Sequence, residues 1–171
     1  MNDTKPQLRI WLIGLTMFGI LIAMSILRGD ASPYTIVDHQ AAGTAEIVDT
    51  IQASWREAGL RNWMIVSMLG DLIFIGFYGW GSFVAGRSLS RINTGLLRTI
   101  GVIVAAAAVI FLVTDYVETS LQLVQMLNEQ GSDWMAATAA TMQPIKIAAW
   151  FVTFLGVLVA LVVRRFAGDT A

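Results

Sequence analysis

The chain has 171 residues, of which 56% are hydrophobic and only 13% are charged, and its formal net charge is −1. Soluble domains are about 45–50% apolar and about 25% charged, and the mean hydropathy of +0.67 departs from them in the same direction. This composition excludes a disordered chain, a nucleic-acid-binding protein and an ordinary soluble enzyme. We therefore expect an integral membrane protein that contacts membrane lipids and binds no nucleic acid.

Four stretches are long and apolar enough to be membrane-spanning helices, since about 20 apolar residues cross a hydrocarbon core of about 30 Å. They lie at about residues 10–27, 63–85, 99–120 and 145–163. Their length, and the lack of an alternating apolar pattern, argue against the strands of a membrane barrel. The sequence therefore predicts an all-α fold, a single four-transmembrane-helix domain that covers residues 1–171.

Most basic residues lie on one side of the predicted bundle. Seven of the eleven Lys and Arg residues fall at the N-terminus, between the second and third spans, or at the C-terminus. They are Lys5, Arg9, Arg87, Arg91, Arg98, Arg164 and Arg165. Because segments rich in Lys and Arg stay in the cytoplasm, we expect a multi-pass protein of the cell inner (plasma) membrane with both termini cytoplasmic. The loops 28–62 and 128–142 then face outward.

The first outward loop contains a short amphipathic helix, predicted from about Thr44 to Ala58 and followed by Gly59, a residue typical of helix ends. The apolar residues that would share one face of this helix are Ile47, Val48, Ile51 and Trp55. This pattern predicts a helix that lies at the membrane interface or caps the bundle. His39, earlier in the same loop, is expected to be solvated.

Small residues recur along three of the predicted spans and would allow helices to approach closely. They are Gly76, Gly79, Gly81, Ser82 and Gly86 in the second span, Gly101 and Ala105 to Ala108 in the third, and Gly156 and Ala160 in the fourth. Such faces also serve association between chains, so a homo-oligomer or a membrane partner subunit is one expectation. Pro144 fits the first turn of the fourth span.

Four ionisable side chains lie inside the predicted spans, where each costs about 2.5–3.5 kcal/mol on insertion scales. They are Asp71, Asp115, Glu118 and Lys146. From the helical rise of 1.5 Å per residue, the last three fall at matching depth in the outer third of the membrane. Asp115 and Glu118 share one helix face, and this predicts an ion pair with Lys146 on the next span.

Asp71 lies deeper than these three residues, and Tyr78 follows it seven residues later along the same span. We group Asp71, Tyr78, Asp115, Glu118 and Lys146 as an intramembrane polar cluster. One interpretation is a structural clamp between helices, and the other is a ligand-binding site, because charges within spans are enriched at functional sites. Both interpretations stay open.

The second, third and fourth spans carry the motifs Asp71-x-x-Phe74-x-x-x-Tyr78, Asp115-x-x-Glu118 and Lys146. In these motifs the chain resembles small four-helix bacterial inner-membrane proteins that are themselves uncharacterised. The motifs are short, and the resemblance covers spans two to four. It implies a topology and no activity.

The sequence carries no signature of a catalytic or cofactor site. Cysteine is absent and histidine occurs once, which excludes thiolate metal sites and multi-histidine sites within one chain. The Walker A, Gly-x-Ser-x-Gly and His-Glu-x-x-His motifs are absent as well. We therefore expect no cofactor, no metal and no catalytic residue, and the sequence favours a non-enzymatic role.

Three hypotheses follow for the function. The first is a non-enzymatic membrane protein that binds a partner subunit or a lipid-like small ligand through spans two to four. The alternative is a small proton-coupled transporter or channel, in which Asp71 titrates and the Asp115/Glu118/Lys146 cluster forms a gate. The third is a membrane enzyme with Asp115 or Glu118 as a general base.

Overall fold

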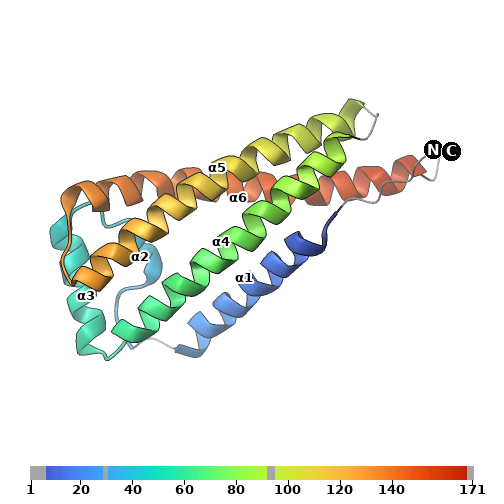
Figure 1. Cartoon of the computed structure of the whole chain (residues 1–171). Helices are drawn as coiled ribbons and strands as arrows, with labels where there is room; N and C mark the ends of the chain where they lie inside the picture. The colour runs from blue at the N-terminus through green and yellow to red at the C-terminus, as the bar shows by residue number, and fades with distance from the viewer. Residues whose placement is uncertain (1–6, 29–30, 92–94, 169–171) are drawn as a thin grey trace.

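The computed structural model describes residues 7–28, 31–91 and 95–168. All regular structure in these ranges is helical, and the four longest helices form one elongated bundle (Figure 1). They are α1 (Arg9–Arg28), α4 (Arg61–Ser90), α5 (Gly95–Asn128) and α6 (Asp133–Gly168). Each contains a stretch that is long and apolar enough to cross a membrane. The prediction of an all-α chain with four helices able to span a membrane is therefore confirmed.

Each long helix packs mainly against the long helices that precede and follow it along the chain. α4 packs against α1 on one side and α5 on the other, and α5 packs along α6. Between α1 and α6, ring contacts bridge the bundle, with centroids 6.2 Å apart for Trp11 and Phe154 and 5.4 Å apart for Phe18 and Trp150. The backbones of α1 and α6 are not packed along one another, so the bundle is least closed there.

Two short helices, α2 (Ile36–Gln40) and α3 (Ala45–Glu57), cover one end of the bundle (Figure 1). Thr35 begins α2 with a capping box, and the Thr44 hydroxyl accepts a hydrogen bond from the first turn of α3. Gly59 follows α3 with a φ of +68°, a conformation that glycine adopts without strain. We call this end of the bundle the capped end and the opposite end the terminal end.

α3 buries one face against the bundle, which explains why it covers this end. Val48, Ile51 and Trp55 are buried in one cluster with Met64 of α4. Ile47, which the sequence places on the same face, is 46% exposed. The predicted amphipathic helix is thus present, and its most buried residues contact protein.

Polar contacts fasten the ends of α5 and α6 to this cap. The carboxylate of Glu129 lies 3.0 Å from the Arg61 guanidinium and 3.6 Å from that of Arg56. In addition, Asp133 Oδ1 accepts a hydrogen bond of 2.7 Å from the backbone N–H of Ala45. The capped end is therefore held by apolar packing and by ion pairs together.

The fourth long helix begins earlier than the sequence indicates. Residues 133–142, predicted as part of an outward loop, form the first turns of α6, with the carboxylate of Asp133 in the first turn. This segment is rich in alanine, the strongest helix former, and an acidic residue stabilises a helix N-terminus. Pro144 consequently lies inside the helix, so its prediction in the first turn is wrong.

The expectation that His39 is solvated is also wrong. The residue is only 2% exposed, because its ring packs on Trp55 at a centroid distance of 5.1 Å and its Nε2 lies 3.2 Å from Gln52 Nε2. Burial lowers the pKa of His39 to about 4, since the charged imidazolium loses its hydration. The packing of α2 on α3 produces this environment, and the local sequence does not reveal it.

Candidate functional site

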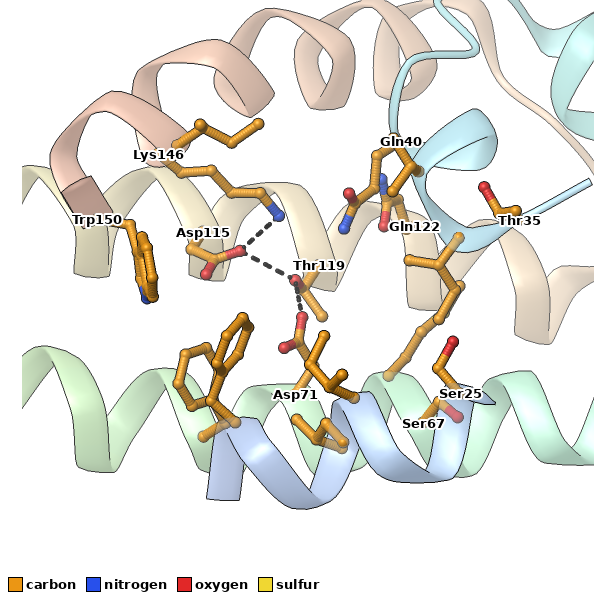
Figure 2. Close-up of a pocket in the computed structure, with 18 of the residues that line it drawn as sticks. Ser25, Thr35, Gln40, Ser67, Asp71, Asp115, Thr119, Gln122, Lys146 and Trp150 are labelled. Carbon is orange, nitrogen blue, oxygen red and sulfur yellow. Dashed lines mark hydrogen bonds and ion pairs between the residues drawn. The ribbon is translucent and has the colours of Figure 1, made fainter. Parts of the chain in front are cut away.

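A pocket of about 410 Å³ lies among the four long helices and α2, in the half of the bundle near the capped end (Figure 2). Its polar lining comprises Ser25 of α1, Thr35 and Gln40 of α2, Ser67 and Asp71 of α4, Asp115, Thr119 and Gln122 of α5, and Lys146 of α6. Pockets that bind small molecules have volumes of roughly 300–1,000 Å³. This cavity is therefore large enough for a small ligand.

Apolar and aromatic side chains form the rest of the wall. They include Phe18, Leu21, Ile22, Met64, Met68, Phe74, Phe111, Ile147, Trp150 and Phe151. Three of them, Ile22 of α1 with Ile147 and Phe151 of α6, are about half exposed on the outside of the bundle, at 47%, 45% and 51%. The pocket thus reaches the surface between α1 and α6, where the bundle is least closed.

Lys146 joins two carboxylates of α5. Its Nζ lies 2.9 Å from Asp115 Oδ1 and 2.8 Å from Glu118 Oε1. The exposed fractions of Lys146, Asp115 and Glu118 are only 8%, 3% and 0%. The predicted ion pair between the third and fourth spans is therefore present and buried, and both acids share one lysine.

Asp71 is connected to this group through a threonine. The Thr119 hydroxyl donates to Asp71 Oδ2 at 3.3 Å and lies 3.5 Å from Asp115 Oδ1. Figure 2 shows the resulting row of side chains from Asp71 across Thr119 and Asp115 to Lys146. Three helices, α4, α5 and α6, thus contribute to one polar cluster.

Thr119 was not singled out from the sequence, although a signal for it exists. It follows Asp115 by four residues, so the two side chains share a helix face. The contributions of Thr35 and Gln40 carry no comparable signal, because α2 reaches the pocket only by folding back over the bundle. Local spacing therefore identifies part of the lining and tertiary packing supplies the rest.

Tyr78 lies apart from this cluster, in a layer of rings toward the terminal end. Its hydroxyl lies 2.8 Å from Thr153 Oγ1 and donates to the Trp150 carbonyl at 3.3 Å. This aromatic layer takes rings from all four long helices and consists of Phe18, Phe74, Tyr78, Phe111, Trp150 and Phe154. This layer forms the apolar floor of the pocket on the side of the terminal end. Tyr78 does not line the pocket itself but packs against three rings that do, those of Phe74, Phe111 and Trp150.

The chemistry of the pocket is that of carboxylates, amides, hydroxyls and one ammonium group. Within residues 7–28, 31–91 and 95–168, no three His, Asp or Glu side chains gather so that they could hold a metal ion. The side chains that do gather suit hydrogen bonding and charge pairing with a polar group in an apolar enclosure.

Comparisons of the chain with protein-family models, with curated proteins and with solved structures find no match. The resemblance to small bacterial four-helix membrane proteins stays a prediction.

Proposed function

We propose that this chain is an integral membrane protein that binds a lipid-like, amphiphilic small ligand in the pocket between its spans. The observation that carries this proposal is the combination, in one cavity of about 410 Å³, of aromatic walls with buried charged groups. Small-molecule sites typically have mostly apolar walls and a few polar groups that orient the ligand. An amphiphile offers the complementary pair, an apolar tail and a polar head.

The pocket opening supports a ligand that arrives from the membrane. Ile22, Ile147 and Phe151 line the cavity and are also exposed on the outside of the bundle. In a bilayer this surface between α1 and α6 would face lipid tails. A ligand dissolved in the membrane would therefore enter sideways, with its tail along the aromatic layer and its head at Asp71 and Lys146.

The site is wider than spans two to four, because α1 and α2 contribute to its wall. The geometry also favours a small ligand over a partner subunit. The small residues that suggested a partner pack within the chain, where Gly86 meets Ala105, Gly101 meets Ser90 and Gly156 meets Val104. A partner subunit or a second copy of the chain would need another surface.

The distribution of charge supports an orientation with both termini in the cytoplasm. Six arginines lie at the terminal end, Arg9, Arg87, Arg91, Arg98, Arg164 and Arg165, against three at the capped end, Arg28, Arg56 and Arg61. The capped end also holds the acidic residues Glu46, Asp49, Glu57, Glu129 and Asp133. By the positive-inside rule, the pocket would lie in the outer half of the inner (plasma) membrane, with α3 at the outer interface. A green fluorescent protein fused after Ala171 should then fluoresce; an exported reporter active at that position would contradict this orientation.

Native mass spectrometry of protein purified from membranes tests the ligand proposal. Ser67 lines the pocket, whereas its neighbour Val66 is 54% exposed. Ser67→Trp would fill the cavity, and Val66→Trp, the matched control, adds the same bulk to the outer face. We expect the parent and Val66→Trp to retain a bound amphiphile and Ser67→Trp to lose it. Equal retention by a folded Ser67→Trp, or no bound amphiphile on the parent, would contradict the proposal.

A second candidate, the small proton-coupled transporter or channel, is favoured by the row of polar contacts that joins three carboxylates. Contacts of 2.8–3.5 Å run from Asp71 through Thr119 and Asp115 to Lys146 and Glu118. Proton relays in membrane proteins use chains of such groups. In proteoliposomes with an imposed potential, the parent should conduct protons and Asp71→Asn should not. Proton flux unaffected by Asp71→Asn would remove this candidate.

A further inference from the structure

Three oxygen atoms in the charged part of the pocket are open hydrogen-bond acceptors. Asp71 Oδ1, Asp115 Oδ2 and Gln122 Oε1 accept no hydrogen bond from any residue that the structure describes. All three side chains line the pocket, and Asp115 and Gln122 are only 3% and 2% exposed. An apolar occupant would displace water from these oxygens without supplying a donor, which is costly, so this part of the pocket favours an occupant that donates hydrogen bonds.

The donor groups beside these acceptors already make contacts within the cluster. Lys146 Nζ is held by Asp115 at 2.9 Å and by Glu118 at 2.8 Å. The Thr119 hydroxyl donates to Asp71, and the Gln122 amide donates to Glu118 at 3.5 Å. Open acceptors therefore gather at the charged part of the pocket, whereas the buried indole N–H of Trp150, in the aromatic wall, has no acceptor in the described part of the chain.

The balance of charge points in the same direction. The cluster holds three carboxylates, those of Asp71, Asp115 and Glu118, against the single ammonium of Lys146. Glu118 is fully buried outside the pocket lining and close to Lys146, so it suits the role of counter-ion to this lysine. Asp71 and Asp115 then face the cavity with a formal excess of negative charge. An uncompensated buried charge is costly, and a cation in the pocket would compensate one of the two excess negative charges.

From these acceptors and this charge we infer that the ligand carries a primary ammonium group on an apolar tail. Its three N–H groups match the open oxygens of Asp71, Asp115 and Gln122. The tail would cross Phe74 and Trp150 toward the opening between α1 and α6. This inference rests on the ligand binding proposed above and adds the chemistry of the head group.

The test compares amphiphiles that share a dodecyl tail and differ only in their head group. Dodecylamine supplies charge and N–H donors, dodecyltrimethylammonium supplies charge alone, dodecanol supplies a neutral donor, and dodecanoate supplies the opposite charge. Binding to the full chain in maltoside micelles is measured by titration in native mass spectrometry. We expect dodecylamine to bind at least about tenfold more tightly than dodecanol, with dodecyltrimethylammonium between them and dodecanoate weakest.

Substitution of one carboxylate locates the effect in the pocket. Asp71→Asn should weaken dodecylamine about tenfold and leave dodecanol binding unchanged, which also shows that the pocket is still folded. Glu57→Gln is the matched control, because it removes the carboxylate of an exposed residue on α3. This control should bind every amphiphile as the parent does.

The outcomes separate the head-group inference from the proposed function. If dodecanol binds as tightly as dodecylamine and Asp71→Asn weakens neither, the ammonium inference fails while amphiphile binding stands. If every amphiphile binds the parent and Ser67→Trp equally well, both the ammonium inference and the proposed ligand binding fail.

A primary ammonium occurs on free alkylamines and also on the head group of phosphatidylethanolamine. A second arm therefore offers the protein phosphatidylethanolamine beside phosphatidylcholine, whose head group lacks N–H donors. Preferential retention of phosphatidylethanolamine would identify a lipid as the source of the ammonium. Retention of dodecylamine without that preference would identify a free amine, and loss of both preferences would overturn the inference.

Discussion

The two halves of the bundle are packed in different ways. In the terminal half, small residues bring helix backbones into contact: a carbon added at Gly86 would lie 2.6 Å from the nitrogen of Ala105 and 2.8 Å from the oxygen of Gly101. In the capped half, aromatic and charged side chains keep the helices apart around a cavity of about 410 Å³. The same four helices thus form a tight core at one end and an open site at the other.

This difference shows that small residues and ionisable residues have different roles along one bundle. Small residues drive close association of helices in lipid, whereas ionisable residues inside a membrane are costly and mark sites. Here the two kinds are separated by the aromatic layer, with Asp71, Asp115 and Lys146 on the side of the cap. Substitutions on the two sides of the aromatic layer should therefore have different consequences.

Removal of the buried lysine should have the largest effect on stability. Lys146→Ala leaves Asp115 and Glu118 without their shared partner, which should cost about 3–5 kcal/mol of unfolding free energy. Thermal melting in detergent measures the loss, and adding Asp115→Asn to Lys146→Ala should restore part of it. The control Arg98→Ala removes an exposed cation and should change stability by less than about 0.5 kcal/mol. Parent-like melting of Lys146→Ala would show that the pair contributes nothing.

Lowering the pH should destabilise the packing of α2 on α3 at the capped end, where His39 is buried. The pKa of this residue is about 4 in the folded chain against a usual 6.5, so between these values the unfolded chain binds a proton that the folded chain does not. The stability of the cap is therefore complete above pH 6.5 and falls as the pH drops toward 4, by up to about 3 kcal/mol. Hydrogen exchange of the α3 amides across this range measures the effect.

The variant His39→Gln should lose this pH dependence between pH 6.5 and 4. Asp38, its neighbour, does not interfere, because hydrogen bonds from the backbone and side chain of Thr35 lower the pKa of Asp38 below its usual 3.8. Stability from Asp38 is therefore lost only at more acid pH. The same exchange profile in His39→Gln and in the parent would contradict the role given to His39.

Glycine-to-alanine changes should have opposite signs at packed and open positions. Gly86→Ala puts a methyl group against the Ala105 backbone, and overpacking of this kind costs about 1–3 kcal/mol. Gly19 of α1 has open space at the same position, so Gly19→Ala should stabilise its helix by up to about 1 kcal/mol. Unfolding of both variants in one detergent measures the difference. Equal effects would mean that the terminal half is not tightly packed.

The sequence predicts the spans and the ion pair because both depend on position along the chain. A membrane requires a run of apolar residues, and depth follows from counting residues at 1.5 Å each. Counting places Asp115 and Lys146 at one level, and the structure joins them at 2.9 Å. The same count explains why Tyr78 lies apart from Asp71, since seven residues separate the two by about 10 Å along the helix.

The pocket itself could not be predicted, because its shape depends on how each helix is rotated and where α2 folds. Phe74 and Phe111 share helix faces with Asp71 and Asp115, so part of the apolar floor has a sequence signal. Phe18 of α1 and Gln40 of α2 have none, since tertiary packing alone brings them to the cavity. Burial of His39 against Trp55 depends on the same folding of α2.

Cysteine accessibility tests the contrast between the two halves most directly, because the chain contains no cysteine of its own. Ser67 lines the pocket of the capped half, and Ser82 is 0% exposed in the packed terminal half, so Ser67→Cys and Ser82→Cys place one thiol in each. Labelling with a small methanethiosulfonate reagent should be fast at Ser67→Cys, slowed by added dodecylamine, and undetectable at Ser82→Cys. Equal labelling of the two variants, or faster labelling of Ser82→Cys, would contradict a bundle that is open at the capped end and closed at the other.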